Sequence, residues 1–287
     1  MTLHYDISEL SPYINWVYYY FAWQVKQPDE QQRLRLEAEE TLLQLEGRYH
    51  AHATFQIVEA YSDGDDIVVL RGERSEVRGE RSEVRGERIP CLRQQEVGSE
   101  YLCLADFIQP LNTNLSPLTS HPSPLKSTIG LFATSVDSAM VTDFADDPYM
   151  KMMTQLLADR LAEAAAEKMH ESVRRQYWGY APDEQLTIDE LHQEHFQGIR
   201  PAVGYPSLPD ASINFILDRL IDFSQIGITL TENGAMRPHA SVSGLMMAHP
   251  KAHYFSIGRI GTDQLNDYSQ RRGLPVEQTR KYLAANI

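Results

Sequence analysis

The stretch at residues 198–206 has the composition best suited to hold a small polar ligand. It reads Gly-Ile-Arg-Pro-Ala-Val-Gly-Tyr-Pro. Two prolines and two glycines favour an extended turn, which would hold Arg200 and the Tyr205 ring in place without a helix. A guanidinium offers paired donors to a carboxylate, and backbone groups in such a turn can bond to a nucleobase edge. The same composition also suits a structural proline loop in which Arg200 caps a helix.

Aromatic residues are concentrated in three other segments, at 13–16, 18–23 and 177–182. The last of these reads Tyr-Trp-Gly-Tyr-Ala-Pro and stands where a long predicted helix ends. Core packing is the simpler explanation for most of these rings, because each aromatic side chain buries a large apolar surface. The 177–182 segment therefore predicts either a hydrophobic plug or part of a site.

Local motifs of several enzyme classes are missing from the sequence. It has no G-x-x-x-x-G-K-[ST], G-x-G-x-x-G, G-x-S-x-G or H-E-x-x-H sequence. Residues 192–195 read His-Gln-Glu-His, which is not a zincin spacing, and no third metal ligand is apparent. Cys91 and Cys103 are too few for a disulfide framework and are expected to be reduced structural thiols. A dinucleotide fold, a hydrolase and a metal site are not indicated.

Composition and charge indicate a folded protein that avoids polyanions. The 287 residues are 42% hydrophobic, and 40 acidic against 26 basic residues give a formal charge of -14. This charge repels nucleic-acid phosphates and anionic membranes. No basic leader precedes an apolar stretch, and the longest apolar run, residues 16–23, is far shorter than the roughly 20 residues that span a bilayer. We expect a cytoplasmic protein with no nucleic-acid or membrane partner.

Helices are predicted from acidic or proline starts, apolar residues on one face and terminal glycines. They lie at residues 28–47, 147–177, 262–273 and 275–284. Strands are predicted from β-branched and aromatic runs between turn residues. They lie at 54–61, 67–70, 226–231, 240–247 and 254–260, and residues 62–66 join the first two as a hairpin. Because strands and helices form separate groups, we expect an α+β fold with an antiparallel sheet. No segment resembles an interdomain linker, so residues 1–287 are expected to form a single domain.

One internal repeat occupies residues 71–88, where the heptad RGERSEV occurs twice and is followed by RGER. A coiled coil needs two apolar positions in each heptad, whereas each copy offers one valine and contains a glycine. The repeat predicts a mobile, charged loop insert with no catalytic role.

Several short motifs, in order along nearly the whole chain, resemble the activation domain of cobalamin (vitamin B12)-dependent methionine synthase. They are YINW at 13–16, LRQQ at 92–95, CLADF at 103–107, ADRLAEA at 158–164, YWGYAP at 177–182, QGIRPAVGYP at 197–206, ASVSG at 240–244 and HP at 249–250. Their common order makes the resemblance specific.

The resemblance implies a C-shaped domain with a central twisted antiparallel sheet flanked by helices, and a site for S-adenosylmethionine. In this family, cobalamin that has oxidised to Co(II) is restored to methylcobalamin by one electron from reduced flavodoxin and a methyl group from S-adenosylmethionine. The domain itself contributes positioning, because the reactivity belongs to the sulfonium and the cobalt. The chain is thus expected to be an accessory component of a methyltransferase that does not complete the reaction alone.

The resemblance also implies roles for individual residues. Arg200 would bind the ligand carboxylate, and the backbone at Ala202 with the ring of Tyr205 would hold the adenosine. Four further residues match positions that line the site or lie near it: Tyr254, Phe255, Glu163 and Glu194. Helical geometry places Glu163 beside the apolar stripe, so a solvated helix face is an equal explanation for that residue.

The sequence departs from the family at three points. Asn15 stands where the family has an aspartate suited to the ligand ammonium, so binding is expected to be weaker here. Residues 245–247, Leu-Met-Met, replace aromatic residues. No D-x-H-x-x-G cobalamin-binding pattern is present, so the cofactor must come from another polypeptide.

Three functions are consistent with these residues. The first is reactivation in trans of a methionine synthase that lacks its own activation domain. The second is an S-adenosylmethionine sensor, and the third is a partner for a different corrinoid methyltransferase. Flavodoxin or another one-electron donor would need a local basic patch on this acidic chain, for which Arg174-Arg175 and Arg271-Arg272 are the candidates.

Overall fold

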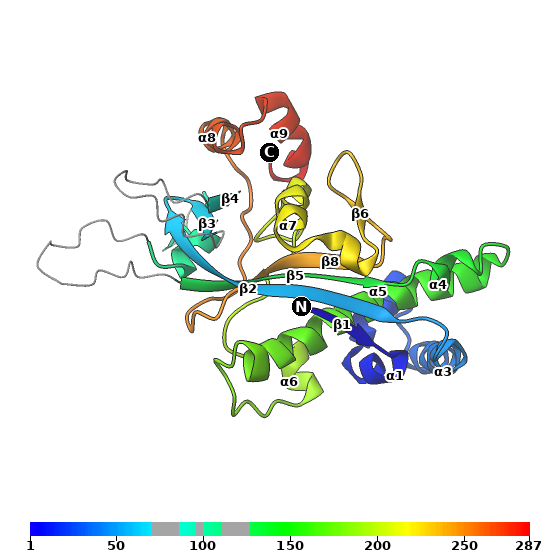
Figure 1. Ribbon diagram of the computed structural model, residues 1–287. Coiled ribbons are helices and arrows are strands. Elements are labelled where there is room, and N and C mark those ends of the chain that lie inside the picture. Colours follow the sequence, from blue (N-terminus) through cyan, green and yellow to red (C-terminus); the bar gives the residue numbers. More distant parts are fainter. Residues whose placement is uncertain (71–85, 96–99, 111–126) are drawn as a thin grey trace, which may run out of the picture. The chain divides into compact units, whose positions relative to one another are not determined.

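The computed structural model describes residues 1–70, 86–95, 100–110 and 127–287 (Figure 1). These residues cluster into two compact units, each assembled from three segments of the chain. Unit 1 contains Met1–Gln56, Phe132–Gln197 and Leu220–Gly244. Unit 2 contains Ile57–Leu131, Gly198–Arg219 and Leu245–Ile287. The heptads of the repeat at residues 71–85 lie outside the described residues, and its last residues, Gly86 to Arg88, belong to strand β4 (Gly86–Pro90).

Unit 1 is built on the long helix α5 (Pro148–Ser172), shown in green in Figure 1. Four shorter helices contact it: α1 (Ile7–Leu10), α2 (Trp16–Ala22), α3 (Pro28–Leu45) and α4 (Ala139–Thr142). The helices predicted at residues 28–47 and 147–177 are therefore confirmed. Helix α3 begins at the proline that the sequence marks, and α5 continues into a π-helix, η3 (Val173–Tyr177).

Helix α5 begins where its sequence provides a cap. The Asp147 carboxylate accepts hydrogen bonds from the backbone N–H groups of Tyr149 and Met150 at 3.0 and 3.1 Å, and Pro148 occupies the first helical position. The first amide groups of a helix have no partner within the helix. Here the aspartate accepts hydrogen bonds from two of them, and the proline has no N–H to satisfy. The apolar face predicted from the sequence is buried, at Met153, Leu157, Leu161, Ala164 and Ala165.

The remaining elements of unit 1 are short. Strand β1 (Thr2–Tyr5) pairs antiparallel with the beginning of β2 (Ala51–Asp63). Strands β6 (Thr229–Leu230) and β7 (Met236–Arg237) form a separate antiparallel pair. Single turns of helix complete the unit: η1 (Ser11–Tyr13), α6 (Ile188–His192) and η5 (Phe223–Ile226).

Unit 2 contains the predicted hairpin. The second half of β2 pairs antiparallel with β3 (Asp66–Leu70), and Gly64 has a positive φ of +60° in the turn between them. Strand β3 then pairs antiparallel with β4. The hairpin is confirmed because the Ser-Asp-Gly-Asp-Asp sequence supplies the left-handed position that a tight turn requires.

Two helices at the end of the chain, α8 (Thr262–Arg272) and α9 (Val276–Tyr282), contact each other and confirm the two predicted there (Figure 1). Helix α8 ends at Gly273, which has a φ of +64°. Unit 2 also holds η2 (Leu104–Phe107), η4 (Ala211–Ile213), η6 (Ala284–Asn286) and most of α7 (Asn214–Ile221). A buried cluster joins the helical end to the preceding segment: Leu92, Ile257, Ile260, Leu265, Tyr268 and Leu283.

Within the described residues, one sheet has the strand order β4-β3-β2-β5-β8, with β1 also pairing with β2. Strands β2, β5 (Ser127–Val136) and β8 (Ser241–Met246) each contribute residues to both units. The expected α+β class with an antiparallel sheet is confirmed. None of the described helices has the length and apolar character needed to cross a bilayer.

Two predicted strands are wrong in whole or in part. Residues 254–260 contain aromatic and β-branched side chains, yet their backbone groups bond to unrelated segments instead of one neighbouring strand. Ile257 N donates to Pro206 O at 2.9 Å, and Ile260 N donates to Asn286 O at 2.8 Å. Of the strand predicted at 226–231, only Thr229–Leu230 pairs in a sheet, because Ile226 closes the helical turn η5.

Candidate ligand-binding site

The first half of the 198–206 loop is hydrogen-bonded to the end of β8 in unit 2. Ile199 and Met247 exchange two backbone hydrogen bonds of 2.9 Å, and Leu245 N donates to Pro201 O at 3.0 Å. Gly198 has a φ of +87°, and a Cβ atom there would lie 2.2 Å from the Met247 carbonyl oxygen. Only glycine fits this close approach, which explains one of the two glycines in the motif.

Arg200 is held through its backbone. Its N–H donates to the Tyr254 hydroxyl oxygen at 2.9 Å, a contact between residues 54 positions apart. Arg200 and Tyr254 are both half-buried. Tyr254 therefore positions the backbone of the loop. This role adds to the predicted one, in which Tyr254 lines the site.

The second half of the loop is a compact turn around Tyr205. Gly204 N donates to Leu208 O at 2.8 Å, and Leu208 N returns a bond to Tyr205 O at 2.9 Å. Tyr205 N donates to Ala202 O at 3.2 Å. The backbone of the turn is thus fixed, while 52% of Tyr205 stays exposed. An exposed ring on a fixed backbone is a suitable surface for stacking a flat heterocycle.

Ser207 joins this loop to the 254–257 segment and was not predicted from the sequence. Its hydroxyl donates to Phe255 O and accepts from Phe255 N at 3.3 Å. The Phe255 ring lies 6.4 Å from the Phe107 ring, measured between centroids. A single buried serine carries no recognisable pattern, so its role depends on the tertiary contact alone.

Asn15 lies in unit 1 as the N-cap of helix α2. Its Oδ1 accepts a hydrogen bond from Val17 N at 3.2 Å, and the residue is half-buried. Asparagine is among the preferred N-cap residues, so this local role accounts for its presence without a ligand. The amide oxygen has a second lone pair, which leaves it able to accept another hydrogen bond.

Tyr13 fixes the chain just before Asn15. Its hydroxyl donates to Glu171 at 2.6 Å, and its carbonyl lies 3.0 Å from Nε2 of His192 in α6. Burial, together with the hydrogen bond to Glu171, raises the pKa of Tyr13 above its ordinary value, in keeping with a hydroxyl that donates to a carboxylate. The 13–15 segment is therefore tied to both α5 and α6.

Glu163 and Glu194 occupy different environments in unit 1. Glu163 pairs with Arg160 at 3.1 Å on α5, and the Arg160 guanidinium lies 5.8 Å from the centre of the Tyr18 ring of α2. Glu194 follows α6 as an exposed residue with a φ of +60°. Glu163 is thus an ion-paired, partly buried side chain, and a fully solvated face does not describe it.

Taken by unit, the predicted site residues fall into two groups. Unit 2 brings together Arg200, Ala202, Tyr205, Tyr254 and Phe255 on two segments joined by hydrogen bonds. Unit 1 holds Asn15, Glu163 and Glu194 on α2, α5 and the end of α6, which the Tyr18–Arg160 and Tyr13–His192 contacts connect. Among the residues that the structure describes, no cluster of three or more His, Cys, Asp and Glu is placed to bind a metal ion.

The predicted basic patch at Arg174-Arg175 is wrong. Arg174 is fully buried and pairs with Glu184, and Arg175 pairs with Glu171 at 2.9 Å. The dipeptide exposes a single guanidinium, and that one is already paired with a carboxylate.

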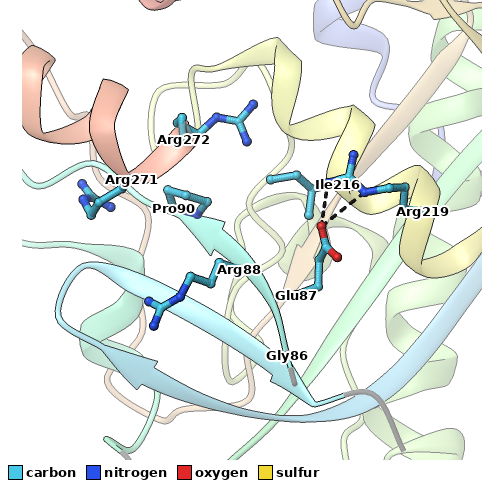
Figure 2. Close-up of a pocket in the computed structure, with 8 residues that line it drawn as sticks. All are labelled: Gly86, Glu87, Arg88, Pro90, Ile216, Arg219, Arg271 and Arg272. Carbon is cyan, nitrogen blue, oxygen red and sulfur yellow. Dashed lines mark hydrogen bonds and ion pairs between the residues drawn. The ribbon is translucent and has the colours of Figure 1, made fainter. Parts of the chain in front are cut away.

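The other predicted patch lines a pocket of about 300 Å³ in unit 2, shown in Figure 2. Its wall includes four arginines: Arg88, Arg219, Arg271 and Arg272. Each of them lies within ion-pair distance of a carboxylate, and the partners are Asp63, Asp66, Glu87, Asp210 and Asp267. Four guanidinium groups beside five carboxylates do not make a basic patch, and we assign the pocket no anion.

A comparison with known families identifies the family to which the chain belongs. The sequence model described as "Vitamin B12 dependent methionine synthase, activation domain" matches residues 6–273. The chain belongs to this family. The resemblance inferred from the eight motifs is therefore confirmed, and the matched range includes every predicted site residue.

A solved structure of the family has the same fold. The protein titled "Crystal Structure of the MetH Reactivation Domain bound to AdoHcy" is 34% identical in sequence, with a TM-score of 0.84. The match covers 100% of this chain and 90% of that one. The activation-domain fold thus accommodates the departures at Asn15 and at residues 245–247.

Proposed function

We propose that this activation domain binds S-adenosylmethionine and supports the reductive methylation of cobalamin carried by a separate methionine synthase. One observation carries the proposal: the loop at 198–207 holds an arginine, backbone groups and an exposed tyrosine ring in fixed positions. The related domain whose title names AdoHcy supports the same ligand class, because AdoHcy is S-adenosylmethionine without its methyl group.

The residues of unit 2 fit the chemistry of this ligand. The guanidinium of Arg200 suits the carboxylate of the amino-acid part. The turn backbone at Ala202 and the exposed ring of Tyr205 suit the adenine, which has both hydrogen-bonding edges and a flat face. Tyr254 and Phe255 would flank the adenosine and, through the bonds to Arg200 and Ser207, also hold the loop.

The family resemblance implies that three residues of unit 1 would supply acceptors for the ammonium group. Asn15 would accept a hydrogen bond from it with the lone pair that Val17 N does not use. Glu163 and Glu194 would provide negative charge nearby. An asparagine in place of an aspartate gives a weaker, uncharged contact, so we expect a lower affinity than an aspartate would support.

When bound, S-adenosylmethionine would supply a methyl group to cobalt that has gained one electron from a donor, leaving S-adenosylhomocysteine as the product. The residues of this chain would contribute orientation, because they would hold the ligand by its carboxylate and its adenine. Fixing two reactants in this way removes much of the entropic barrier of a bimolecular step. The chain would thus act as an accessory to a methyltransferase.

Both the cobalamin and the electron would come from partners. We propose that a cobalamin-bearing methionine synthase lacking its own activation domain carries the cobalamin. Flavodoxin or another one-electron donor would supply the electron. Arg174 and the arginines of the Figure 2 pocket are paired with carboxylates, so we do not place the donor at either dipeptide.

Asn15 favours a second candidate, an S-adenosylmethionine sensor that does not support methyl transfer. A sensor would bind the ligand without accelerating remethylation. A reactivation partner for another corrinoid protein would accelerate it with that protein and not with methionine synthase.

Calorimetry with S-adenosylmethionine tests the binding site directly. We expect the wild-type chain to bind and Arg200→Ala to lose about 1.5–3 kcal/mol of binding free energy, the usual contribution of a charge-assisted hydrogen bond. Arg33→Ala, on the exposed face of α3, is the control and should bind like wild type. Equal binding by Arg200→Ala, or none by wild type at millimolar ligand, would refute the site.

A remethylation assay then separates the candidate functions. The chain is mixed with a Co(II)-cobalamin methionine synthase lacking an activation domain, S-adenosylmethionine and a one-electron reductant, and the cobalamin absorbance is followed. We expect the rate of methylcobalamin formation to rise with added wild-type chain and to rise much less with added Arg200→Ala. The rate should depend on the amount of chain because, without a covalent linker, the domain must meet its partner in solution. Proven ligand binding without acceleration would leave the sensor as the function.

A further inference from the structure

A buried polar cluster lies in unit 1 where α5 passes into the π-helix η3. Arg174 is the largest fully buried side chain there, and Glu184 is 8% exposed at its side chain. The Arg174 Nε lies 2.9 Å from one Glu184 carboxylate oxygen, and Nη2 lies 2.7 Å from the other. This two-point contact fixes the plane of the guanidinium.

The fixed guanidinium gives the neighbouring hydrogen bonds a direction. Nη1 of Arg174 lies 2.8 Å from Nδ1 of His170, and arginine can only donate. Nδ1 of His170 must therefore accept, which places the ring hydrogen on Nε2. That nitrogen lies 3.4 Å from the Tyr180 hydroxyl, and the hydroxyl in turn donates to Gln197 O at 3.4 Å.

The side chains of Arg174 and His170 also enclose Phe196. The guanidinium of Arg174 lies 4.2 Å from the centre of the Phe196 ring. The His170 ring meets it edge-on, with centroids 5.0 Å apart and an interplanar angle of 87°. Phe196 is 8% exposed, so its ring is packed between two groups that the Glu184 contact holds in place.

The π-helix brings Tyr180 back toward His170. Trp178 N donates to Val173 O at 2.9 Å, a bond across five residues, and Gly179 then turns the chain with a φ of +71°. Ala181 N donates to Arg174 O at 3.0 Å. π-helical turns often occur at functional sites.

The residues that this cluster holds, Phe196 and Gln197, directly precede Gly198. Because the peptide unit is planar, fixing the carbonyl of Gln197 also fixes the direction of the Gly198 N–H. Gly198 is the residue with no room for a Cβ atom, so the entry to the loop tolerates little displacement.

We infer that the cluster of Glu184, Arg174, His170 and Tyr180 is a positioning device that holds the Gln197–Gly198 peptide, and through it the S-adenosylmethionine loop, in its binding conformation. The inference rests on the proposed function for the role of the loop. None of the four residues needs to touch the ligand, since they act on the backbone that leads to Arg200 and Tyr205.

Tyr180→Phe removes one hydroxyl and keeps the ring. Tyr149→Phe is the matched control, because Tyr149 lies in the first turn of α5, at the end away from η3, and is also accessible to solvent. Hydrogen exchange at residues 197–205 gives a readout that needs no ligand, since Ile199, Arg200 and Gly204 all donate backbone bonds there. We expect exchange at these amides to be about three- to tenfold faster in Tyr180→Phe than in the wild-type chain. Exchange in α3 should not change in Tyr180→Phe, and exchange at residues 197–205 should not change in Tyr149→Phe.

The affinity for S-adenosylmethionine should fall by a similar factor of about three to ten in Tyr180→Phe, while the melting temperature changes by less than about 2 °C. A purely structural role would lower the melting temperature and speed exchange throughout α5 without a preference for 197–205. Unchanged exchange and affinity in a chain that binds the ligand would overturn the positioning role and leave the proposed function standing. Absence of binding by the wild-type chain would overturn the proposed function and the ligand role of the loop with it.

Discussion

Helix α5 and the loop at residues 198–207 satisfy their backbone groups in different ways. The helix closes its own hydrogen bonds, and its start is capped by the adjacent Asp147. The loop depends on residues far along the chain: Tyr254 is 54 positions from Arg200, and Phe255 is 48 from Ser207. Local sequence is therefore sufficient to predict the helix, whereas the loop takes its conformation from tertiary contacts.

This difference determines where substitutions should act. A change in α5 affects the free energy of unfolding according to how deeply the side chain is buried, because the backbone is already satisfied. A change in the loop affects its geometry through one or two long-range contacts. Neighbouring residues with the same chemistry can thus differ widely in effect.

The largest effect is expected at the end of the helix, from Arg174→Met. It would leave the Glu184 carboxylate buried without its cation, so we expect a loss of about 3–5 kcal/mol in the free energy of unfolding. Arg175→Met is the control: its pair with Glu171 is half-exposed, and its loss should cost less than about 0.5 kcal/mol. Urea unfolding of both variants measures the contrast, and similar losses would show that burial does not separate the two arginines.

An intermediate effect is expected in the loop, where two glycines share a φ of +87° and differ in the space around them. Gly198→Ala would place Cβ 2.2 Å from Met247 O, whereas nothing lies within 4 Å of the same atom at Gly204. Both variants incur the conformational cost of a left-handed alanine. We expect Gly198→Ala to lose about 1–3 kcal/mol more than Gly204→Ala in urea unfolding, because overpacking adds to that cost. Equal losses would mean that the loop can move away from β8.

The smallest effect is expected from Asn15→Asp, which restores a carboxylate at the start of α2. Aspartate and asparagine cap helices about equally, so the free energy of unfolding should change by less than about 1 kcal/mol. Under the proposed function, the affinity for S-adenosylmethionine should rise by about two- to tenfold, since a charged acceptor binds an ammonium more strongly. Calorimetry measures both this variant and Asn15→Ser, which keeps a cap without the charge. Unchanged affinity in Asn15→Asp would restrict Asn15 to its capping role.

Much of the fold was predictable from local patterns. Helices α3, α5, α8 and α9 and the β2–β3 hairpin lie where proline, aspartate and glycine mark their ends. The strand predicted at 254–260 was wrong because side-chain preference does not reveal whether a neighbouring strand is available. Those residues find single partners in Pro206, Ser207 and Asn286.

The candidate site was predictable only where a motif named its residues. Arg200 and Tyr205 stand out because prolines and glycines surround them. Ser207 and Glu184 carry no such pattern, and their roles depend on the side chains that folding brings to them. The basic patches predicted at Arg174-Arg175 and Arg271-Arg272 were wrong for the same reason, since a dipeptide does not show which guanidinium is buried or paired with a carboxylate.

The amino-acid sequence by itself determined the helix starts and the hairpin, because each depends on residues within a few positions of one another. It also determined the family, through short motifs in a common order along the chain. It singled out the 198–206 loop as the candidate ligand loop. Tertiary structure alone decided how the loop is held, which arginine is buried and why Gly198 cannot carry a side chain. These outcomes depend on contacts between residues up to 54 positions apart, such as Arg200 and Tyr254. The free energy of a buried charge or a crowded atom is set by its surroundings, and those exist only in the folded chain.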